Sequence, residues 1–328
     1  MTRPQGQLAI VLHTHMPYVE GFGTWPFGEE WLWEAIAGCY VPLLEVLGRA
    51  PITLSLTPVL CDQLEAPGAI QRCLEFLREI RPESHHRDAV HYRRAGQPEL
   101  VAEVERSAAE YAAAADRLAA LPGGLLGALG EHVSWTSSAT HAVLPLLATE
   151  AGVELQVQTG LASHRRRFGD WGGGFWLPEC AYAPWLDYAL EEAGVRATCV
   201  ELTAAFGLGD DRHLRPLATD EGPVLWPLDR EIVALVWGEG GYPASSAYRD
   251  YYHRTAHDHR LWRNDGAPYD PDAARALVAE HAREFVSRVL ERMAGCACAR
   301  STPNCSVIGG TRGWRGCVRC STRRRAKS

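Results

Sequence analysis

The residues with the clearest chemical potential lie at 175–182, where the sequence reads Phe-Trp-Leu-Pro-Glu-Cys-Ala-Tyr. A single carboxylate, Glu179, stands between Trp176 and Tyr182, and three glycines at 172–174 precede the segment. The glycines let the backbone turn sharply into a short buried strand. Flat aromatic faces beside an acid suit a site that packs sugar rings, although most such carboxylates are only solvated.

Two histidines form a second candidate site. The apolar run at 8–12 is typical of a buried parallel strand, and His13 and His15 follow it directly. In an α/β barrel, site residues lie at the carboxyl ends of the strands. The pair could bind a metal, as in amidohydrolase-type barrels, or contact a substrate. A third interpretation is that one histidine only hydrogen-bonds a neighbouring loop.

His141 ends the segment Trp-Thr-Ser-Ser-Ala-Thr-His at 135–141, which precedes Leu-Pro-Leu-Leu at 144–147. A lone histidine at a helix start is usually structural. Ser138 with His141 could suggest a serine hydrolase, but no Gly-x-Ser-x-Gly turn surrounds the serine. We therefore do not predict that chemistry.

These segments resemble glycoside hydrolase family 57, in its α-1,4-glucan branching enzyme branch. Trp-Leu-Pro-Glu-Cys-Ala-Tyr resembles the family's nucleophile motif, residues 13–18 resemble its His-x-His-x-Pro-Tyr motif, and Ser-Ala-Thr-His at 138–141 also has a counterpart. The resemblance covers about residues 8–293. It implies an α/β fold with an incomplete (β/α)7-type barrel and helical insertions, followed by an irregular tail. It also implies that Glu179 is the nucleophile of a retaining glycosyl transfer.

Later segments also resemble the family. The family's Pro-Arg-Asp, Val-Trp-Ser and Gly-Tyr-Pro-Gly segments align with residues 227–229, 236–238 and 241–244. Leu228 stands where the family has a substrate-contacting arginine, and Ala244 replaces the second loop glycine. Arg230 could substitute for the arginine if the loop shifts. The resemblance thus implies a substrate-binding set made of His13, His15, His141, Trp176, Arg230, Trp237 and Tyr242.

The second carboxylate of the reaction is missing from these residues. Retaining enzymes need two carboxyl groups about 5–5.5 Å apart. The family's acid/base aspartate lies in a later Asp-x-Glu-Leu-x-Gly-His-Trp motif, which the 328 residues do not contain. Loss of a general acid costs about 10²–10⁴-fold in rate, so we expect defective catalysis. The alternatives are a non-catalytic α-glucan-binding protein and a metal-dependent amidohydrolase or deacetylase.

Strand and helix patterns alternate along the chain, as in α/β folds. Apolar spacing predicts helices over 29–47, 60–81 with a break at 67–68, 99–121, 185–193 and from Asp270 onward. Strands are predicted at 8–12, 51–57, 197–200, 224–227 and 233–237. We interpret His85 and His86 as a polar surface rather than a ligand set.

The composition is that of an ordinary globular protein, with 46% hydrophobic and 22% charged residues. No apolar run reaches the ~18 residues of a membrane span, and the first residues lack the features of a signal peptide. We therefore expect a cytoplasmic protein without a membrane or nucleic-acid partner and without a cofactor or bound metal. Its expected partner is an α-glucan, and its oligomeric state stays open.

Residues 295–328 differ from the body at 1–294, which we interpret as the N-terminal part of the catalytic barrel. The tail holds seven Arg, one Lys and no acidic residue, so its charge of +8 within a net −7 leaves −15 for the body. Cys296, Cys298, Cys317 and Cys320 could bind zinc, although the first pair is too closely spaced for a typical knuckle. A basic arm at 323–327 could bind phosphates. We prefer the interpretation that the tail is disordered or translated out of frame.

Overall fold

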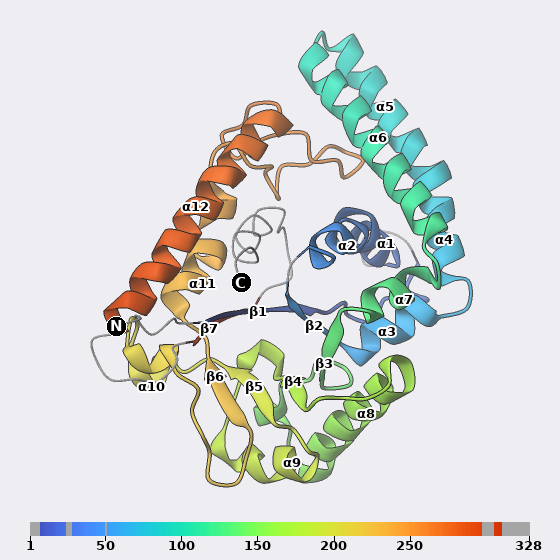
Figure 1. The fold of residues 1–328 in the computed structure, drawn as a ribbon. Coiled ribbons are helices and arrows are strands. Elements are labelled where there is room, and N and C mark those ends of the chain that lie inside the picture. Colours follow the sequence, from blue (N-terminus) through green and yellow to red (C-terminus); the bar gives the residue numbers. More distant parts are fainter. Residues whose placement is uncertain (1–6, 24–27, 50, 297–304, 310–328) are drawn as a thin grey trace, which may run out of the picture.

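A sheet of parallel strands organises the chain (Figure 1). The computed structural model describes residues 7–23, 28–49, 51–296 and 305–309. In the order β6-β5-β4-β3-β2-β1-β7, each described strand is hydrogen-bonded in parallel to its neighbours. The strands are β1 (Gln7–Thr14), β2 (Thr53–Leu56), β3 (Val133–Ser137), β4 (Gly174–Trp176), β5 (Ala197–Val200), β6 (Val224–Pro227) and β7 (Cys305–Gly309).

The barrel is incomplete, as predicted. β6 and β7 are the two ends of the strand order, so the hydrogen bonding does not close into a ring among the described strands. Helical insertions interrupt the strand–helix alternation, most prominently between β2 and β3. The α/β class and the (β/α)7-type arrangement inferred from the sequence are therefore both present.

One segment of the tail is a strand rather than irregular chain. Residues 305–309 form β7, which pairs with β1 from Gln7 to Val11. The free edge of β1 offers unpaired backbone groups, and Val307 and Ile308 are β-branched residues that favour strands. The proposed zinc ligands Cys298, Cys317 and Cys320 and the basic arm lie outside the described residues.

The helices largely follow the sequence expectation. The 29–47 helix is continuous and contains one π-helical turn, η1 (Ile36–Tyr40), just before Pro42. The break at 67–68 is present, with Gly68 in the left-handed region at φ 77°. The helices, of α or π type, are α1 (Glu30–Ala35), α2 (Val41–Leu47), α3 (Pro58–Glu65), α4 (Ala69–Glu75), η2 (Phe76–Ile80), α5 (Arg81–Arg94), α6 (Pro98–Ala120), α7 (Gly124–Gly130), α8 (Glu150–Phe168), α9 (Asp187–Glu192), α10 (Thr203–Phe206), α11 (Arg230–Trp237) and α12 (Pro271–Cys296). None of the helices described is long and apolar enough to cross a membrane.

The predicted strand at 233–237 is wrong, because this segment is the second half of α11. The Asp229 side chain caps the helix by accepting a hydrogen bond from the Glu231 backbone N–H. Ile232, Val233 and Val236 are buried, which is helical spacing. A short apolar run does not by itself distinguish a buried strand from a buried helix. In this segment the N-cap at Asp229 indicates the helix.

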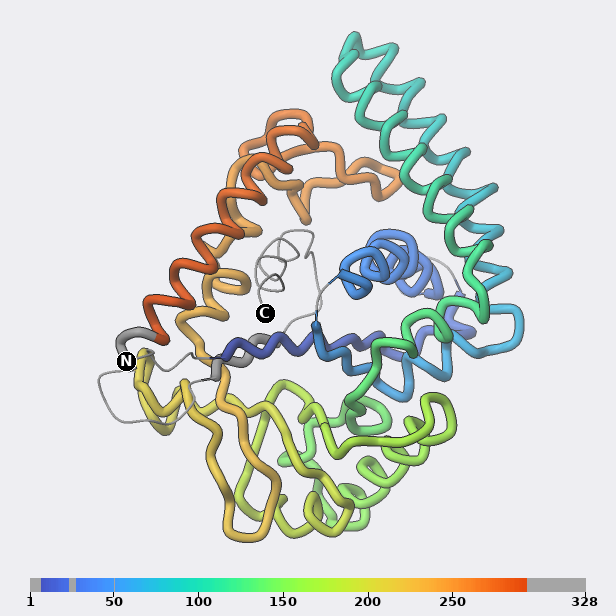
Figure 2. Tube along the Cα trace, viewed as in Figure 1, coloured from blue at the N-terminus to red at the C-terminus, as the bar shows by residue number. Residues whose placement is uncertain are grey.

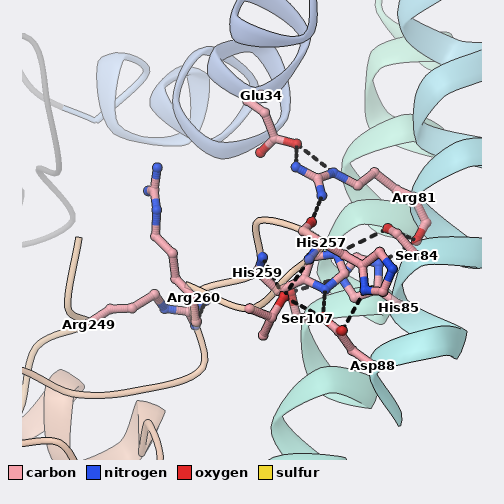
Figure 3. Close-up of polar contacts among 11 residues, drawn as sticks. Glu34, Arg81, Ser84, His85, Asp88, Ser107, Arg249, His257, His259 and Arg260 are labelled. Carbon is pink, nitrogen blue, oxygen red and sulfur yellow. Dashed lines mark hydrogen bonds and ion pairs between the residues drawn. The ribbon is translucent and has the colours of Figure 1, made fainter. Parts of the chain in front are cut away.

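α5 and α6 form a hairpin that extends away from the sheet (Figure 1). The chain between α11 and α12 runs across to this hairpin (Figure 2). Figure 3 shows the contact, in which His257 Nδ1 and His259 Nδ1 donate to the two carboxylate oxygens of Asp88, at 2.6 and 2.7 Å. Burial favours a raised pKa for Asp88, but hydrogen bonds from His259, Thr255 and His257 outweigh it and lower the pKa to about 2. The carboxylate therefore stays ionised and fastens the loop to the hairpin.

His85 belongs to this contact, so the expectation of a polar surface is wrong for it. Its ring is 3% exposed and stacks on His259 with 3.9 Å between ring centroids. Its Nε2 lies 3.1 Å from Ser107 Oγ on α6. His86, by contrast, is exposed as expected. The partner of His85 comes from a segment about 170 residues further along the chain, which local sequence patterns do not reveal.

Candidate active site

The candidate site lies where the carboxyl ends of β1 to β4 come together. In the parallel register, His13 is opposite Ser55, Ser55 is opposite Trp135, and Ser137 is opposite Trp176. The carboxyl ends of these parallel strands therefore lie at the same edge of the sheet, which is where α/β barrels carry their active sites. The Ser137 hydroxyl donates to the Trp176 backbone carbonyl at 2.8 Å, which fixes the end of β4 against β3.

Four aromatic rings form one continuous stack at these strand ends. Trp176 lies on His13 with 4.9 Å between ring centroids, His13 on His141 with 5.0 Å, and His141 on His15 with 4.1 Å. Neighbouring rings are within about 20° of parallel. The structure thus brings together four of the predicted substrate-binding residues, and we refer to them as the histidine stack.

The histidines of the stack are neutral near pH 7. Burial, followed by the nearby His141 and His15, holds the pKa of His13 well below 6.5. Burial and His141 lower the pKa of His15 to about 4. Burial also lowers the pKa of His141, with Glu179 acting in the opposite direction. Neutral imidazoles offer one donor and one acceptor each, which suits hydrogen bonding to sugar hydroxyl groups.

The stack does not resemble a metal site. His13 Nδ1 lies 3.1 Å from Ser55 Oγ and His15 Nδ1 lies 3.3 Å from Thr57 Oγ1, so each of these nitrogens already has a hydroxyl partner. No group of three or more His, Cys, Asp or Glu side chains suited to a metal ion occurs among residues 7–23, 28–49, 51–296 and 305–309. The metal interpretation of His13 and His15 therefore lacks a ligand set in the part of the chain described.

Acid should destabilise the fold through the stack. Above pH 7 the histidines are neutral in both folded and unfolded chains. As the pH falls below 6.5 the unfolded chain takes up protons that the folded His15 accepts only near pH 4, so stability falls across this window. We expect the urea midpoint to drop from pH 7.5 to pH 4.5, and to drop less in His15→Gln. The exposed His86→Gln is the control, and an equal drop in both variants would contradict the prediction.

Glu179 sits in a strained turn immediately after β4. It is the central residue of a 3-10 turn, η4 (Pro178–Cys180), with φ 57° and ψ 16°, and Cys180 follows with φ 53°. Such left-handed conformations in non-glycine residues cost about 1–3 kcal/mol each and cluster at functional sites. The turn leaves Glu179 exposed while Pro178 and Cys180 are buried. His141 has a positive φ as well, at 60°.

His141 precedes no helix directly, in contrast to the sequence expectation. It lies in the loop between β3 and a short 3-10 turn, η3 (Leu144–Leu146), and its backbone N–H donates to the Ser138 carbonyl at 3.2 Å. Glu179 lies three residues after Trp176 of the stack, in the turn that follows β4. The Glu179 carboxylate also opposes the lowering of the His141 pKa by burial, in agreement with this placement.

A second carboxylate, Glu201, was missed by the sequence analysis. It follows β5 directly, and its Oε2 lies 3.1 Å from Nε of Arg230. Burial raises the pKa of the Cys180 thiol, with Glu179 and Glu201 adding to the effect and Arg230 opposing it. Arg230 is therefore near the strained turn, but paired with Glu201. The rule that selected His13, a polar residue just after a buried strand, would also have selected Glu201.

Trp237 and Tyr242 differ in how far their rings are covered by the protein. Trp237 ends α11 and is 41% exposed, so it can serve as a stacking surface. Tyr242 begins the 3-10 turn η7 (Tyr242–Ala244) and stacks on His281 of α12, with 4.2 Å between ring centroids. One face of Tyr242 is thus covered by the protein itself.

Comparison with known proteins places the chain in a family. A model described as glycosyl hydrolase family 57 matches residues 134–260, which include Glu179. A 1,4-alpha-glucan branching enzyme of Thermococcus kodakarensis is 32% identical over 337 residues, covering 87% of this chain and 49% of that protein. A probable 1,4-alpha-glucan branching enzyme of Mycobacterium tuberculosis is 31% identical over 325 residues, covering 88% and 60%.

Solved structures agree. The GH57-type branching enzyme of Pyrococcus horikoshii superposes with a TM-score of 0.84 at 29% identity, over 93% of this chain and 62% of that one. The alpha-amylase AmyC of Thermotoga maritima shares the fold, with a TM-score of 0.80 at 22% identity. The chain spans about half to three fifths of the length of the curated relatives it matches. Across that length, the chain belongs to glycosyl hydrolase family 57.

Proposed function

We propose that the chain acts on α-1,4-glucans by retaining glycosyl transfer of the branching-enzyme type, with Glu179 as nucleophile. The observation that carries this proposal is the placement of Glu179 beside the histidine stack, at the carboxyl ends of the strands. The relatives that match the chain over most of its length are 1,4-alpha-glucan branching enzymes. Residues 1–294 form the catalytic barrel portion in this proposal, and the chain takes part in glycogen-type glucan metabolism in the cytoplasm.

In this reaction Glu179 attacks the anomeric carbon and the bond to the leaving glucan oxygen breaks. A covalent glycosyl–enzyme ester results, which is then attacked by a sugar 6-hydroxyl. His13, His15 and His141 hydrogen-bond the sugar, Trp176 supports the stack, and Trp237 provides an aromatic surface. Arg230 and Tyr242 complete the proposed binding set.

The leaving oxygen must be protonated, and we expect this step to limit the rate of transfer. The 328 residues lack the family's acid/base motif, and the nearby Glu201 is engaged by Arg230. We therefore propose that the chain binds α-glucan but transfers it poorly. A purely glucan-binding role is the second candidate, favoured by this missing group together with the exposed Trp237.

The test combines binding with turnover. We expect the purified 328-residue chain to bind maltoheptaose in calorimetry, and to branch amylose at least ~10²-fold more slowly than a family enzyme that has both carboxylates. Branches are counted after isoamylase digestion. Absence of maltoheptaose binding would overturn the proposal. Binding that is equal in the wild type and Glu179→Gln, without any turnover, would favour the binding role instead.

A further inference from the structure

Ser55 is a fully buried hydroxyl at the end of β2 that neither the reaction nor the binding set uses. It lies opposite His13 in the register, and its Oγ is 3.1 Å from His13 Nδ1. The same hydroxyl donates to the backbone carbonyl of Thr136 on β3, at 3.3 Å. Ser55 thus links His13 to the rigid centre of the sheet.

These two contacts favour one tautomer of His13. The Thr136 carbonyl can only accept, so we assign the single hydrogen of the Ser55 hydroxyl to that contact. Toward His13 the Ser55 oxygen can therefore only accept, which requires a hydrogen on His13 Nδ1. In a neutral imidazole the other nitrogen, Nε2, then has a free lone pair.

His13 Nε2 is a buried acceptor that needs a donor. It has no hydrogen-bond partner among the described residues, although the side chain is only 5% exposed. The ring is held between Trp176 and His141, so it cannot rotate to satisfy Nε2 elsewhere. A buried acceptor left unsatisfied is destabilising, and a ligand hydroxyl that donates to it would remove this cost.

We propose that Ser55 is a positioning residue, which holds His13 in the Nδ1–H tautomer so that Nε2 accepts a hydrogen bond from a hydroxyl group of the α-glucan. The ligand part of this inference rests on the proposed function. The tautomer part does not, because it follows from contacts within the protein. Ser55 itself touches no sugar in this arrangement and acts only through His13.

The tautomer can be read directly by NMR. In the protein labelled with ¹⁵N-histidine, we expect His13 to show a protonated Nδ1 and an unprotonated Nε2, its signals being assigned as those missing from His13→Gln. In Ser55→Ala the Nδ1 partner is gone, so we expect the Nε2–H form to gain population. Affinity for maltoheptaose should then fall about tenfold, the equivalent of ~1.4 kcal/mol. Ser55→Thr, which keeps the hydroxyl, should restore both.

A matched control exists elsewhere in the chain. Ser107 is also buried and also bonds a histidine, His85, but in the contact between the hairpin and the loop. Ser107→Ala should leave the His13 signals and the maltoheptaose affinity unchanged. An Nε2–H tautomer of His13 in the wild type, or unchanged His13 signals in Ser55→Ala, would overturn the inference. If Ser55→Ala does not fold, the wild-type and Ser55→Thr spectra still decide.

The two proposals fail in different ways. If the wild type does not bind maltoheptaose, the proposed function fails, while the spectrum of the ligand-free protein still reports the tautomer. If the wild type binds the sugar but the tautomer is wrong, only the role of Ser55 is lost.

Discussion

Glu179→Gln should lose covalent capture of a sugar donor that needs no acid. In α-maltosyl fluoride the C1–F bond breaks without protonation of the leaving group, so the missing acid/base residue does not limit the first step. The wild-type chain should therefore form a maltosyl ester on Glu179 and release fluoride. An amide cannot act as this nucleophile, and we expect the rate of fluoride release to fall at least ~10³-fold.

Two readouts define this experiment. Fluoride release gives the rate, and the mass of the intact protein gives the covalent adduct, which peptide mapping assigns to a residue. Glu201→Gln tests the other carboxylate beside Cys180, and the exposed Glu131→Gln is a distant control. An adduct that persists in Glu179→Gln, or that maps to Glu201, would exclude Glu179 as the nucleophile.

Gly160→Ala should destabilise the fold and disturb the site. Gly160 lies within α8 where the helix meets the end of β3, and a Cβ there would stand 2.1 Å from the Ser137 carbonyl oxygen. No real contact is that short, so the backbone must move, at a cost of about 1–3 kcal/mol. Ser137 also bonds the Trp176 carbonyl, so its displacement reaches the histidine stack.

Gly38→Ala is the matched control for this substitution. Gly38 is likewise inside a helical segment, but a Cβ there meets no atom within 4 Å. Replacing a helical glycine by alanine gains about 0.5–1 kcal/mol, so we expect a higher urea midpoint for Gly38→Ala and a lower one for Gly160→Ala. Equal urea midpoints for the two variants would contradict the prediction, because they would mean that α8 and β3 can move apart at little cost in stability.

The sequence predicts the parts of the site that follow local rules. A continuous apolar run identified β1, and the end of that strand identified His13. The same rule would have selected Glu201, which follows the predicted strand at 197–200, but it was not applied there because no motif or aromatic residue marks that strand end. The apolar run at 233–237 was ambiguous, and the strand predicted there was wrong because the helix cap at Asp229 was not taken into account. The motif resemblance supplied Glu179, which residue types alone left as one solvated carboxylate among many.

The spatial relations of the site were beyond local reasoning. The histidine stack joins residues from two strands, β1 and β4, and from two loops, and its order depends on the register of four strands. The left-handed backbone at Glu179 could not be predicted locally, because no glycine marks the position. The buried position of His85 depends on a partner far along the chain.

The hairpin of α5 and α6 holds in place the loop that joins α11 and α12. Besides Asp88, Glu103 on α6 pairs with Arg249 at 3.0 Å, and Tyr92 and Leu100 pack with Leu261 in one apolar cluster. These anchors extend almost to the turn at 95–97. A designer who trims the hairpin as a dispensable outgrowth would therefore also release the loop, whereas an insertion at the turn itself leaves every one of these anchors in place.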